Sequence, residues 1–283
     1  MMKLKDVHQK FATHLAQIYD RAEAENIAWI VLEHLSGQRY HPLTSKDLLV
    51  SREQLSQLEA METRLLAHEP VQYVLNEAWF YDIPFFVNEQ VLIPRPETEE
   101  LVDWILKENA NKKNISILDI GTGSGCIPVI LKRKLPDSRV YGCDISFEAL
   151  KVAQQNAETY QLSIHFFQID ILDQARWLQL PKVDIIVSNP PYISITEKSS
   201  LHPNVAEFEP GLALFVEDTN PLLFYENIAA LAPLILKVGG CMYLEIHEAK
   251  GQQILELYEK AGFSSVLKKD MQGKNRMLKA VRR

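Results

Sequence analysis

Residues 117–130 read ILDIGTGSGCIPVI, a short apolar run that breaks into three glycines and then becomes apolar again. The first part is typical of a buried strand, and the last part has helical character. Gly121, Gly123 and Gly125 lie between the two. Glycines at such a turn let the backbone approach a ligand closely, and the N–H groups at a helix start favour an anionic group. The stretch therefore predicts a strand–turn–helix unit with a ligand at its turn.

The same alternation continues along the chain from about residue 114. Strand-like segments occur at NISILDI (114–120), SRVYGCD (138–144), SIHFFQID (163–170), VDIIVSN (183–189) and GCMYLEI (240–246). Helical segments at 126–135, 146–160 and 221–237 separate most of them. This pattern predicts an α/β fold with a mostly parallel sheet and helices on both faces. Residues 262–283 read as two strands joined at Gln272-Gly273, which predicts an antiparallel edge pair and about seven strands in all.

The first 70 residues have a helical pattern with no strand-like segment. Apolar residues in VHQKFATHLAQIY (7–19) recur at three- and four-residue intervals. Gly37 is a predicted helix C-cap, and Ser51 with Gln54 forms a predicted capping box. We therefore expect residues 1–70 to form a small helical bundle domain.

Residues 71–93 differ, because aromatic and β-branched residues surround turn signals there. They predict a β-hairpin connector between domains. A helix from about Thr98 to Glu108 should follow, within a third segment that covers residues 94–283.

Composition sets further bounds on the class of protein. The chain has 283 residues, 47% of them hydrophobic and 24% charged, as in an ordinary globular protein. A net charge of −7 argues against a scaffold that grips nucleic acid. No apolar run approaches the roughly 18 residues that span a membrane, and the charged start lacks a signal-peptide core.

The three cysteines, Cys126, Cys143 and Cys241, lack paired metal-ligand spacing. They indicate free thiols in a reducing cytoplasm and no metal site.

The glycine spacing restricts the class of ligand that the turn can bind. A dinucleotide fingerprint needs GxGxxG, but Cys126 occupies the third position, and no P-loop lysine follows. GxGxG preceded by the acidic Asp119 resembles motif I of class I S-adenosylmethionine-dependent methyltransferases, which have a Rossmann-like fold. Asp144 ends the second strand, where a carboxylate can accept both hydroxyls of a ribose. Asp170 ends the third strand, near the expected adenine. The alternative for both aspartates is a simple helix or turn cap.

Residues 183–194 read VDIIVSNPPYIS, a strand that ends in two prolines. Prolines cannot donate to a strand ladder, so the simplest interpretation is a strand stop. A second interpretation is a rigid clamp for a planar NH2 group. The Asn189 side-chain oxygen and the Pro190 carbonyl can each accept one N–H, and Tyr192 can pack against the flat group.

NPPY resembles motif IV of enzymes that methylate planar nitrogens, either amines of adenine and guanine or the amide of glutamine. Further segments occur in the order expected of the HemK/PrmC family of release factor glutamine methyltransferases. They are residues 69–102, GTGSG, NPPYIS, FEPGLAL (208–214) and DMQGKNR (270–276). LIPRPETE (92–99) is the most distinctive piece, and the resemblance covers nearly the whole chain.

The resemblance implies S-adenosylmethionine as the cofactor and the glutamine of the GGQ loop of class I peptide chain release factors as the substrate. It also implies a monomer that binds neither membrane nor nucleic acid directly. The implied cofactor loop comprises Gly121, Thr122, Gly123, Ser124 and Gly125. The implied ribose and adenine contacts are Asp144, Asp170 and Ile171. The implied target site comprises Asn189, Pro190, Pro191 and Tyr192, and Asn189 is also an implied cofactor contact. Arg95 is implied as a loop-ordering residue, with a surface salt bridge as the alternative, and Phe86 as a pocket residue, with core packing as the alternative.

Two positions depart from the family pattern. Asn76 replaces a glycine, although asparagine tolerates left-handed turns, and His247 in EIHEAK replaces another. We expect His247 to be a local turn variation.

Other functions remain open on the residues alone. They are methylation of a ribosomal protein glutamine, methylation of adenine N6 or guanine N2 in nucleic acid, and cofactor binding without catalysis. A nicotinamide-dependent dehydrogenase would leave NPPY unexplained.

Overall fold

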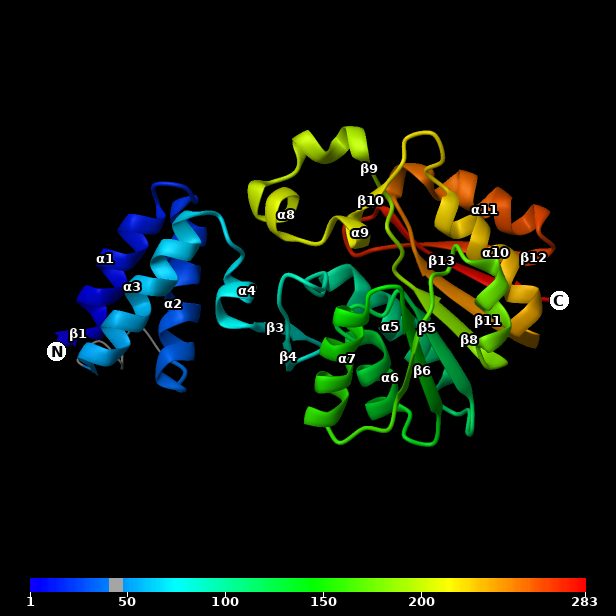
Figure 1. Ribbon diagram of the computed structural model, residues 1–283, viewed down its shortest axis with the longest axis horizontal. Coiled ribbons are helices and arrows are strands. Elements are labelled where there is room, and N and C mark those ends of the chain that lie inside the picture. The colour runs from blue at the N-terminus through cyan, green and yellow to red at the C-terminus, as the bar shows by residue number, and fades with distance from the viewer. Residues whose placement is uncertain (41–47) are drawn as a thin grey trace. The chain divides into compact units, whose positions relative to one another are not determined.

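A computed structural model describes residues 1–40 and 48–283 (Figure 1). The chain packs into two compact units. One contains Met1–Glu77 together with His202–Phe208, and the other contains Ala78–Leu201 and Glu209–Arg283. The domain limits at residues 70 and 93 stay predictions from the sequence. Among the helices that the structure describes, none combines the length and the apolar character needed to cross a bilayer.

The long helices of the first unit are α1 (Leu4–Leu15), α2 (Arg21–Ser36) and α3 (Arg52–Leu66). Their apolar faces enclose a core that includes Leu15, Val31 and Leu65. The predicted capping box is confirmed, since Ser51 and Gln54 exchange both of its hydrogen bonds. Gly37 ends α2 in the left-handed conformation with φ +66°, as predicted. Segment α8 (Pro203–Phe208) also belongs to this unit.

Two details of this region differ from the prediction. A two-residue antiparallel pair joins β1 (Met2–Lys3) to β2 (Leu49–Val50), so the expectation of no strand was wrong. Such a pair is too short to produce a period-two pattern in the sequence. Residues 71–75, expected in the hairpin connector, form the short helix α4 (Val71–Leu75). Asn76 ends it in the left-handed conformation, with φ 53°, which confirms that asparagine tolerates this turn.

The predicted hairpin is present and consists of β3 (Glu77–Phe80) and β4 (Ile83–Phe86). Its two loop residues, Tyr81 and Asp82, have φ values of 54° and 61°. Two consecutive positive φ angles match the twist of antiparallel strands, as in a type I′ turn.

The second unit contains the predicted seven-stranded sheet. The strands are β5 (Ser116–Ile120), β6 (Arg139–Asp144), β7 (His165–Gln168), β8 (Val183–Ser188), β11 (Leu236–Glu245), β12 (Phe263–Lys269) and β13 (Asn275–Arg282). Their order is β12-β13-β11-β8-β5-β6-β7. β13 runs antiparallel to both β11 and β12, and the other neighbouring pairs are parallel, which confirms a mostly parallel sheet with an antiparallel edge pair.

Helices cover both faces of this sheet (Figure 1). They are α5 (Pro96–Asn109), α6 (Cys126–Lys134), α7 (Phe147–Thr159), α10 (Leu223–Ile235) and α11 (Gly251–Lys260), of which α11 was not predicted. Alternate residues of β8 enter two separate cores. Ile185 packs with α5 and α6, whereas Ile186 packs with α10 and α11. The chain runs from β5 outward to β7 and then returns to β8 on the other side of β5. That reversal is where ligands bind in open α/β sheets.

Short segments complete this unit. They are η1 (Gln174–Gln179), β9 (Ile193–Ser194), η2 (Ile195–Ser200), α9 (Gly211–Leu214), β10 (Phe215–Val216) and η3 (Glu248–Lys250).

Candidate active site

A cavity of about 260 Å³ lies at the carboxyl ends of β5, β6, β7 and β8. Its walls come from segments that are far apart in the sequence. They include Gln90–Leu92, Gly121, Gly123, Asp144–Ser146, Ile169–Leu172, Ser188–Pro191 and residues 210, 212 and 213. The lining is mostly apolar, with a few polar groups, as in sites that bind a small organic molecule.

The glycine loop forms one wall of this cavity. Gly121 and Gly123 line the cavity with φ angles of 72° and 52°, which residues with a Cβ rarely adopt. Gly125 lies behind them, where an added Cβ would approach Ala153 of α7 to 3.0 Å. Thr122 and Ser124 are buried and do not line the cavity.

Asp144 lies at the tip of β6 on the cavity wall. One carboxylate oxygen accepts the Gly123 N–H and the other accepts the Ser146 N–H, each at 2.9 Å. Burial raises the pKa of Asp144, and these two hydrogen bonds oppose that rise. The carboxylate is therefore fixed between the glycine loop and the start of α7. It retains lone pairs that can accept further hydroxyl donors.

Asp119, in the middle of the apolar β5, was not among the predicted site residues. Its side chain is completely buried, and neither carboxylate oxygen has a partner within the described part of the chain. Burial raises its pKa to about 7. The Thr122 hydroxyl is also buried, and it opposes this rise in the pKa. An acidic residue in an otherwise apolar strand was the available signal, since such a carboxylate requires a donor or a cation.

Asp170 and Ile171 follow β7 and line the cavity next to Ile169 and Leu172. Ile171 is 8% exposed. Asp170 also caps the turn that follows, since one of its carboxylate oxygens accepts the Leu172 N–H at 2.8 Å. Asp170 therefore both caps the turn and lines the cavity.

The tip of β8 brings the NPPY segment to the wall of the same cavity. Asn189, Pro190 and Pro191 line the cavity. The Ser188 hydroxyl donates to the Ile120 carbonyl at 2.7 Å, which ties this tip to β5. The Asn189 amide nitrogen donates to the Thr98 hydroxyl of α5 at 3.1 Å. Prolines at both following positions restrict the backbone of the segment.

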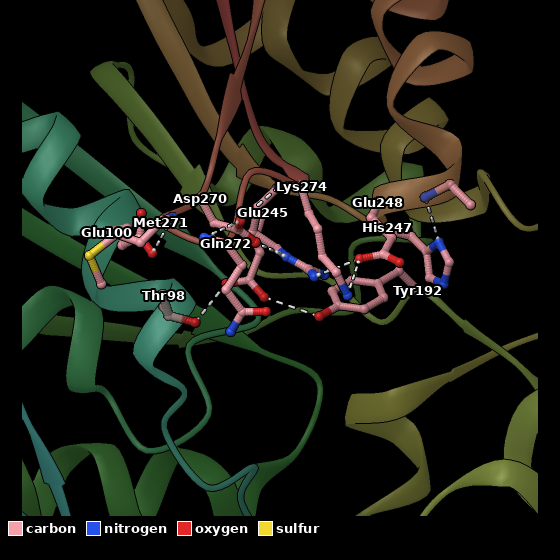
Figure 2. A network of polar contacts seen from close by, with 12 residues as sticks. Thr98, Glu100, Tyr192, Glu245, His247, Glu248, Asp270, Met271, Gln272 and Lys274 are labelled. Carbon is pink, nitrogen blue, oxygen red and sulfur yellow. Dashed lines mark hydrogen bonds and ion pairs between the residues drawn. The ribbon is translucent and has the colours of Figure 1, made fainter.

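Tyr192 lies just outside the cavity lining. Its hydroxyl donates to Glu245, at the end of β11, with an O···O distance of 3.1 Å (Figure 2). Burial and the nearby Glu245 carboxylate raise the pKa of Tyr192, so the phenol stays protonated.

Arg95 pairs with Glu209 at 2.6 Å, and the Ile93 N–H donates to the same carboxylate at 3.4 Å. Glu209 is only 6% exposed. Burial raises its pKa, and Arg95 opposes that effect. The pair joins the segment before α5 to the segment that carries Pro210 and Leu212. Both segments contribute to the cavity wall, and the role of Arg95 in ordering the loop stays a prediction.

Two other singled-out residues lie away from the cavity lining. The main chain of Phe86 exchanges two hydrogen bonds with the Asn156 side chain, at 2.8 and 2.9 Å, and its place in a glutamine pocket stays a prediction. His247 accepts the Ala249 N–H and lies 3.5 Å from Glu197. Its ring also packs edge-on against Tyr192, with centroids 5.9 Å apart (Figure 2).

Fold and site together define a class I methyltransferase. The glycine loop, the Asp144 carboxylate at the end of β6 and the NPPY segment lie around one cavity. The description "Methyltransferase small domain" matches residues 98–207, and "PrmC N-terminal domain" matches residues 6–75. A methyltransferase from Pyrococcus furiosus shares the fold, with a TM-score of 0.51, 16% identity, and coverage of 79% of this chain and 98% of that one.

Full-length relatives are more specific. The chain is 45% identical to the release factor glutamine methyltransferase of Flavobacterium psychrophilum, over 98% of this chain and 99% of that protein. It is 42% identical to the protein of the same name from Bacteroides thetaiotaomicron, over 95% and 96% of the two chains. The chain therefore belongs to the release factor glutamine methyltransferase family.

Proposed function

We propose that this protein transfers a methyl group from S-adenosylmethionine to the side-chain amide nitrogen, N5, of the glutamine in the GGQ motif of class I peptide chain release factors. One observation carries the proposal. In a chain that aligns over its whole length with release factor glutamine methyltransferases, Asn189 and Pro190 share a cavity with the glycine loop and Asp144.

The polar groups around the cavity fit the cofactor. Asp144 lines the cavity and suits the ribose hydroxyls. The unpartnered Asp119 carboxylate lies outside the lining, in β5 directly before the glycine loop, and suits the ammonium group of the methionine part. Ile145 and Ile171 offer apolar surface for a flat base. When bound, S-adenosylmethionine supplies an electrophilic methyl group on a sulfonium.

The contribution of the chain is to position the target amide. An amide nitrogen is a weak nucleophile because its lone pair is delocalised into the carbonyl. The Asn189 oxygen and the Pro190 carbonyl each accept one N–H of the substrate, which aims the lone pair at the methyl carbon. Positioning of this kind can lower a barrier by about 7–11 kcal/mol. Once methylated, the nitrogen is strongly acidic and loses a proton, so no strong general base is required.

We further propose that the protein acts as a monomer in the cytoplasm, without binding nucleic acid. The net charge of −7 disfavours contact with phosphates. Cys126, Cys143 and Cys241 are free and buried, which suits a reducing compartment.

The test is incubation with radiolabelled S-adenosylmethionine and separate purified acceptors: a release factor, ribosomal proteins, ribosomal RNA and DNA. We expect label on the release factor only, and peptide mass mapping should place one methyl group on the GGQ glutamine. Label on a ribosomal protein or on nucleic acid, with none on the release factor, would contradict the proposal.

A further inference from the structure

The orientation of the Asn189 side chain decides whether it can hold an amide substrate. Its amide has an acceptor end, Oδ1, and a donor end, Nδ2. A substrate NH2 group needs the acceptor. If the side chain turned over, two NH2 groups would face each other and no hydrogen bond could form. Something must therefore select one of two arrangements that have nearly the same shape.

Thr98 makes the first contact that distinguishes the two ends. It lies in the first turn of α5 and is 3% exposed. Its hydroxyl oxygen accepts the Asn189 Nδ2–H at 3.1 Å, which leaves Oδ1 as the acceptor for a ligand. A hydroxyl can also donate, however, and a donating Thr98 could equally hold Oδ1. Thr98 alone does not select the orientation.

Glu245 determines which way the Thr98 hydroxyl hydrogen points. It ends β11, is 1% exposed, and its Oε2 accepts the Thr98 hydroxyl hydrogen at 2.6 Å (Figure 2). An ionised carboxylate has no hydrogen to donate. With Glu245 ionised, the single Thr98 hydrogen is committed to Glu245, and Thr98 can only accept from Asn189.

The same carboxylate holds the second clamp residue. Oε1 of Glu245 accepts the Tyr192 hydroxyl at 3.1 Å, so each carboxylate oxygen receives one O–H. Burial raises the pKa of Glu245, whereas these two hydrogen bonds and the positive charge of Arg276 favour the ionised form. Arg276 is itself held by Asp270 and Glu248, each at 3.3 Å. Two O–H donors on two oxygens are the pattern that a carboxylate satisfies.

We propose that Glu245 and Thr98 are positioning residues for methyl transfer, forming a one-way hydrogen-bond relay that holds the Asn189 oxygen toward the substrate and fixes the Tyr192 hydroxyl. The relay rests on the proposed function. It joins three segments, LIPRPETE, NPPY and the end of β11, whose residues are 53 to 147 positions apart. Neither residue touches a reacting atom.

The test compares Thr98→Val, which keeps the shape and removes the hydroxyl, with Thr98→Ser, which keeps the hydroxyl. For Thr98→Val we expect kcat on the release factor to fall about 10- to 100-fold, with KM and the cofactor Kd changed by no more than about twofold. Thr98→Ser should recover most of the loss. Glu245→Gln should also lower kcat, because an amide offers only one acceptor oxygen to two hydroxyls. Tyr258→Phe, which removes a buried hydroxyl bonded to the Tyr225 carbonyl, is the matched control and should keep wild-type kcat.

A second readout does not depend on activity. The side-chain NH2 of Asn189, assigned by its absence from the Asn189→Ala spectrum, should be protected from solvent exchange in the wild type and in Thr98→Ser. It should lose protection in Thr98→Val and shift in Glu245→Gln. Wild-type kcat in Thr98→Val or Glu245→Gln, or equal losses in the Val and Ser variants, would overturn the relay. An inactive wild type with the expected exchange pattern would instead count against the proposed substrate.

Discussion

Asn189 is constrained at its side chain and at its backbone. Its nitrogen is held by Thr98, its backbone continues into two prolines, and its side chain lies on the cavity wall. The oxygen is one of only two acceptors that we assign to the substrate NH2. Its loss should affect the chemical step far more than the binding of the cofactor, which rests on other groups.

Asn189→Ala should therefore lower kcat about 100-fold or more, the size of effect seen when one preorganised hydrogen-bonding group is removed. The affinity for S-adenosylmethionine should stay within a few fold, because the glycine loop and Asp144 are untouched. Single-turnover kinetics and calorimetry on the same preparation measure both quantities. Comparable activity in the variant would rule out the clamp.

Asp119 illustrates the opposite situation, a charged group that folding buries without a partner. Its pKa rises from 3.8 to about 7, so the folded state binds the proton more tightly than the unfolded state does. The stabilising contribution of this proton is complete below about pH 4 and is lost as the pH rises toward about 7. Burial also raises the pKa of Asp144, Glu209 and Glu245, so the wild-type profile alone does not isolate Asp119.

The variant Asp119→Asn separates the contribution of Asp119 to the pH dependence of stability from those of the other carboxylates. The free energy of unfolding, measured by urea titration, should be similar for the variant and the wild type at about pH 4 and higher for the variant at about pH 8. The cofactor Kd should increase, because a neutral amide cannot pair with an ammonium group. A difference in stability that does not change with pH would show that Asp119 titrates normally in the folded protein.

Among the elements, the turn between β5 and α6 contains a glycine that is constrained in two ways. Gly125 combines a φ of 76° with close packing, since an added Cβ would meet Ala153 of α7 at 3.0 Å. Gly273, in the turn between β12 and β13, has a φ of 84° and no atom within 4 Å of an added Cβ. Both glycines have a positive φ, but only Gly125 is crowded, so a comparison of the two distinguishes the effect of backbone strain from that of crowding.

Gly125→Ala should lower the free energy of unfolding by about 1–3 kcal/mol and weaken cofactor binding, because α6 must move away from α7. Gly273→Ala is the control. It should lose only about 1 kcal/mol and bind the cofactor normally. Urea unfolding and calorimetry compare them, and equal effects of both variants would mean that crowding at Ala153 is unimportant.

The Arg95–Glu209 ion pair connects two loops. Arg95→Met leaves a buried carboxylate unpaired and should lower the free energy of unfolding by about 2 kcal/mol or more. Adding Glu209→Gln should restore part of this loss, because no unpaired charge then remains. Both single variants should raise the cofactor Kd, since Val91, Leu92 and Pro210 lie on the loops that the pair joins. A double variant as unstable as the sum of the two single ones would show that the pair is not coupled.

For the whole molecule, the notable feature is that the chain leaves the methyltransferase unit after Leu201 and re-enters it at Glu209. The intervening segment packs within the helical unit. Asn204 donates to the Tyr19 hydroxyl at 3.2 Å, and the His202 ring packs edge-on against His68. NPPY lies before this excursion and the Arg95 partner lies directly after it.

Asn204→Ala should loosen the excursion, so that limited proteolysis cuts within residues 202–208 several-fold faster. Unfolding of the sheet unit should be unchanged, because its core does not include this segment. Asn220→Ala, which removes a surface hydrogen bond to Glu226, is the matched control and should leave the cleavage rate unchanged. Unchanged cleavage in Asn204→Ala would show that the Tyr19 contact does not hold the segment.

Much of this architecture could be predicted from the printed sequence. Strand–helix alternation, the glycine turn, the capping box at Ser51 and the hairpin near Asp82 all depend on residues a few positions apart. Local preferences and short hydrogen bonds decide such features, so sequence patterns report them directly. The short helix at residues 71–75 and the pairing of Met2–Lys3 with Leu49–Val50 escaped prediction because they are too short to set a period.

The partners of the site residues could not be obtained in this way. Asp119 is orphaned, Thr98 meets Asn189 and Glu245, and Arg95 meets Glu209 only because particular strands and loops become neighbours on folding. Those neighbours are separated by about a hundred residues, and no local preference acts over that distance. Sequence patterns therefore identified Gly121, Asp144 and Asn189, which line the cavity and to which we assign the binding of the reactants. Packing of the sheet decided which oxygen accepts, which hydrogen is donated and which carboxylate is left without a partner.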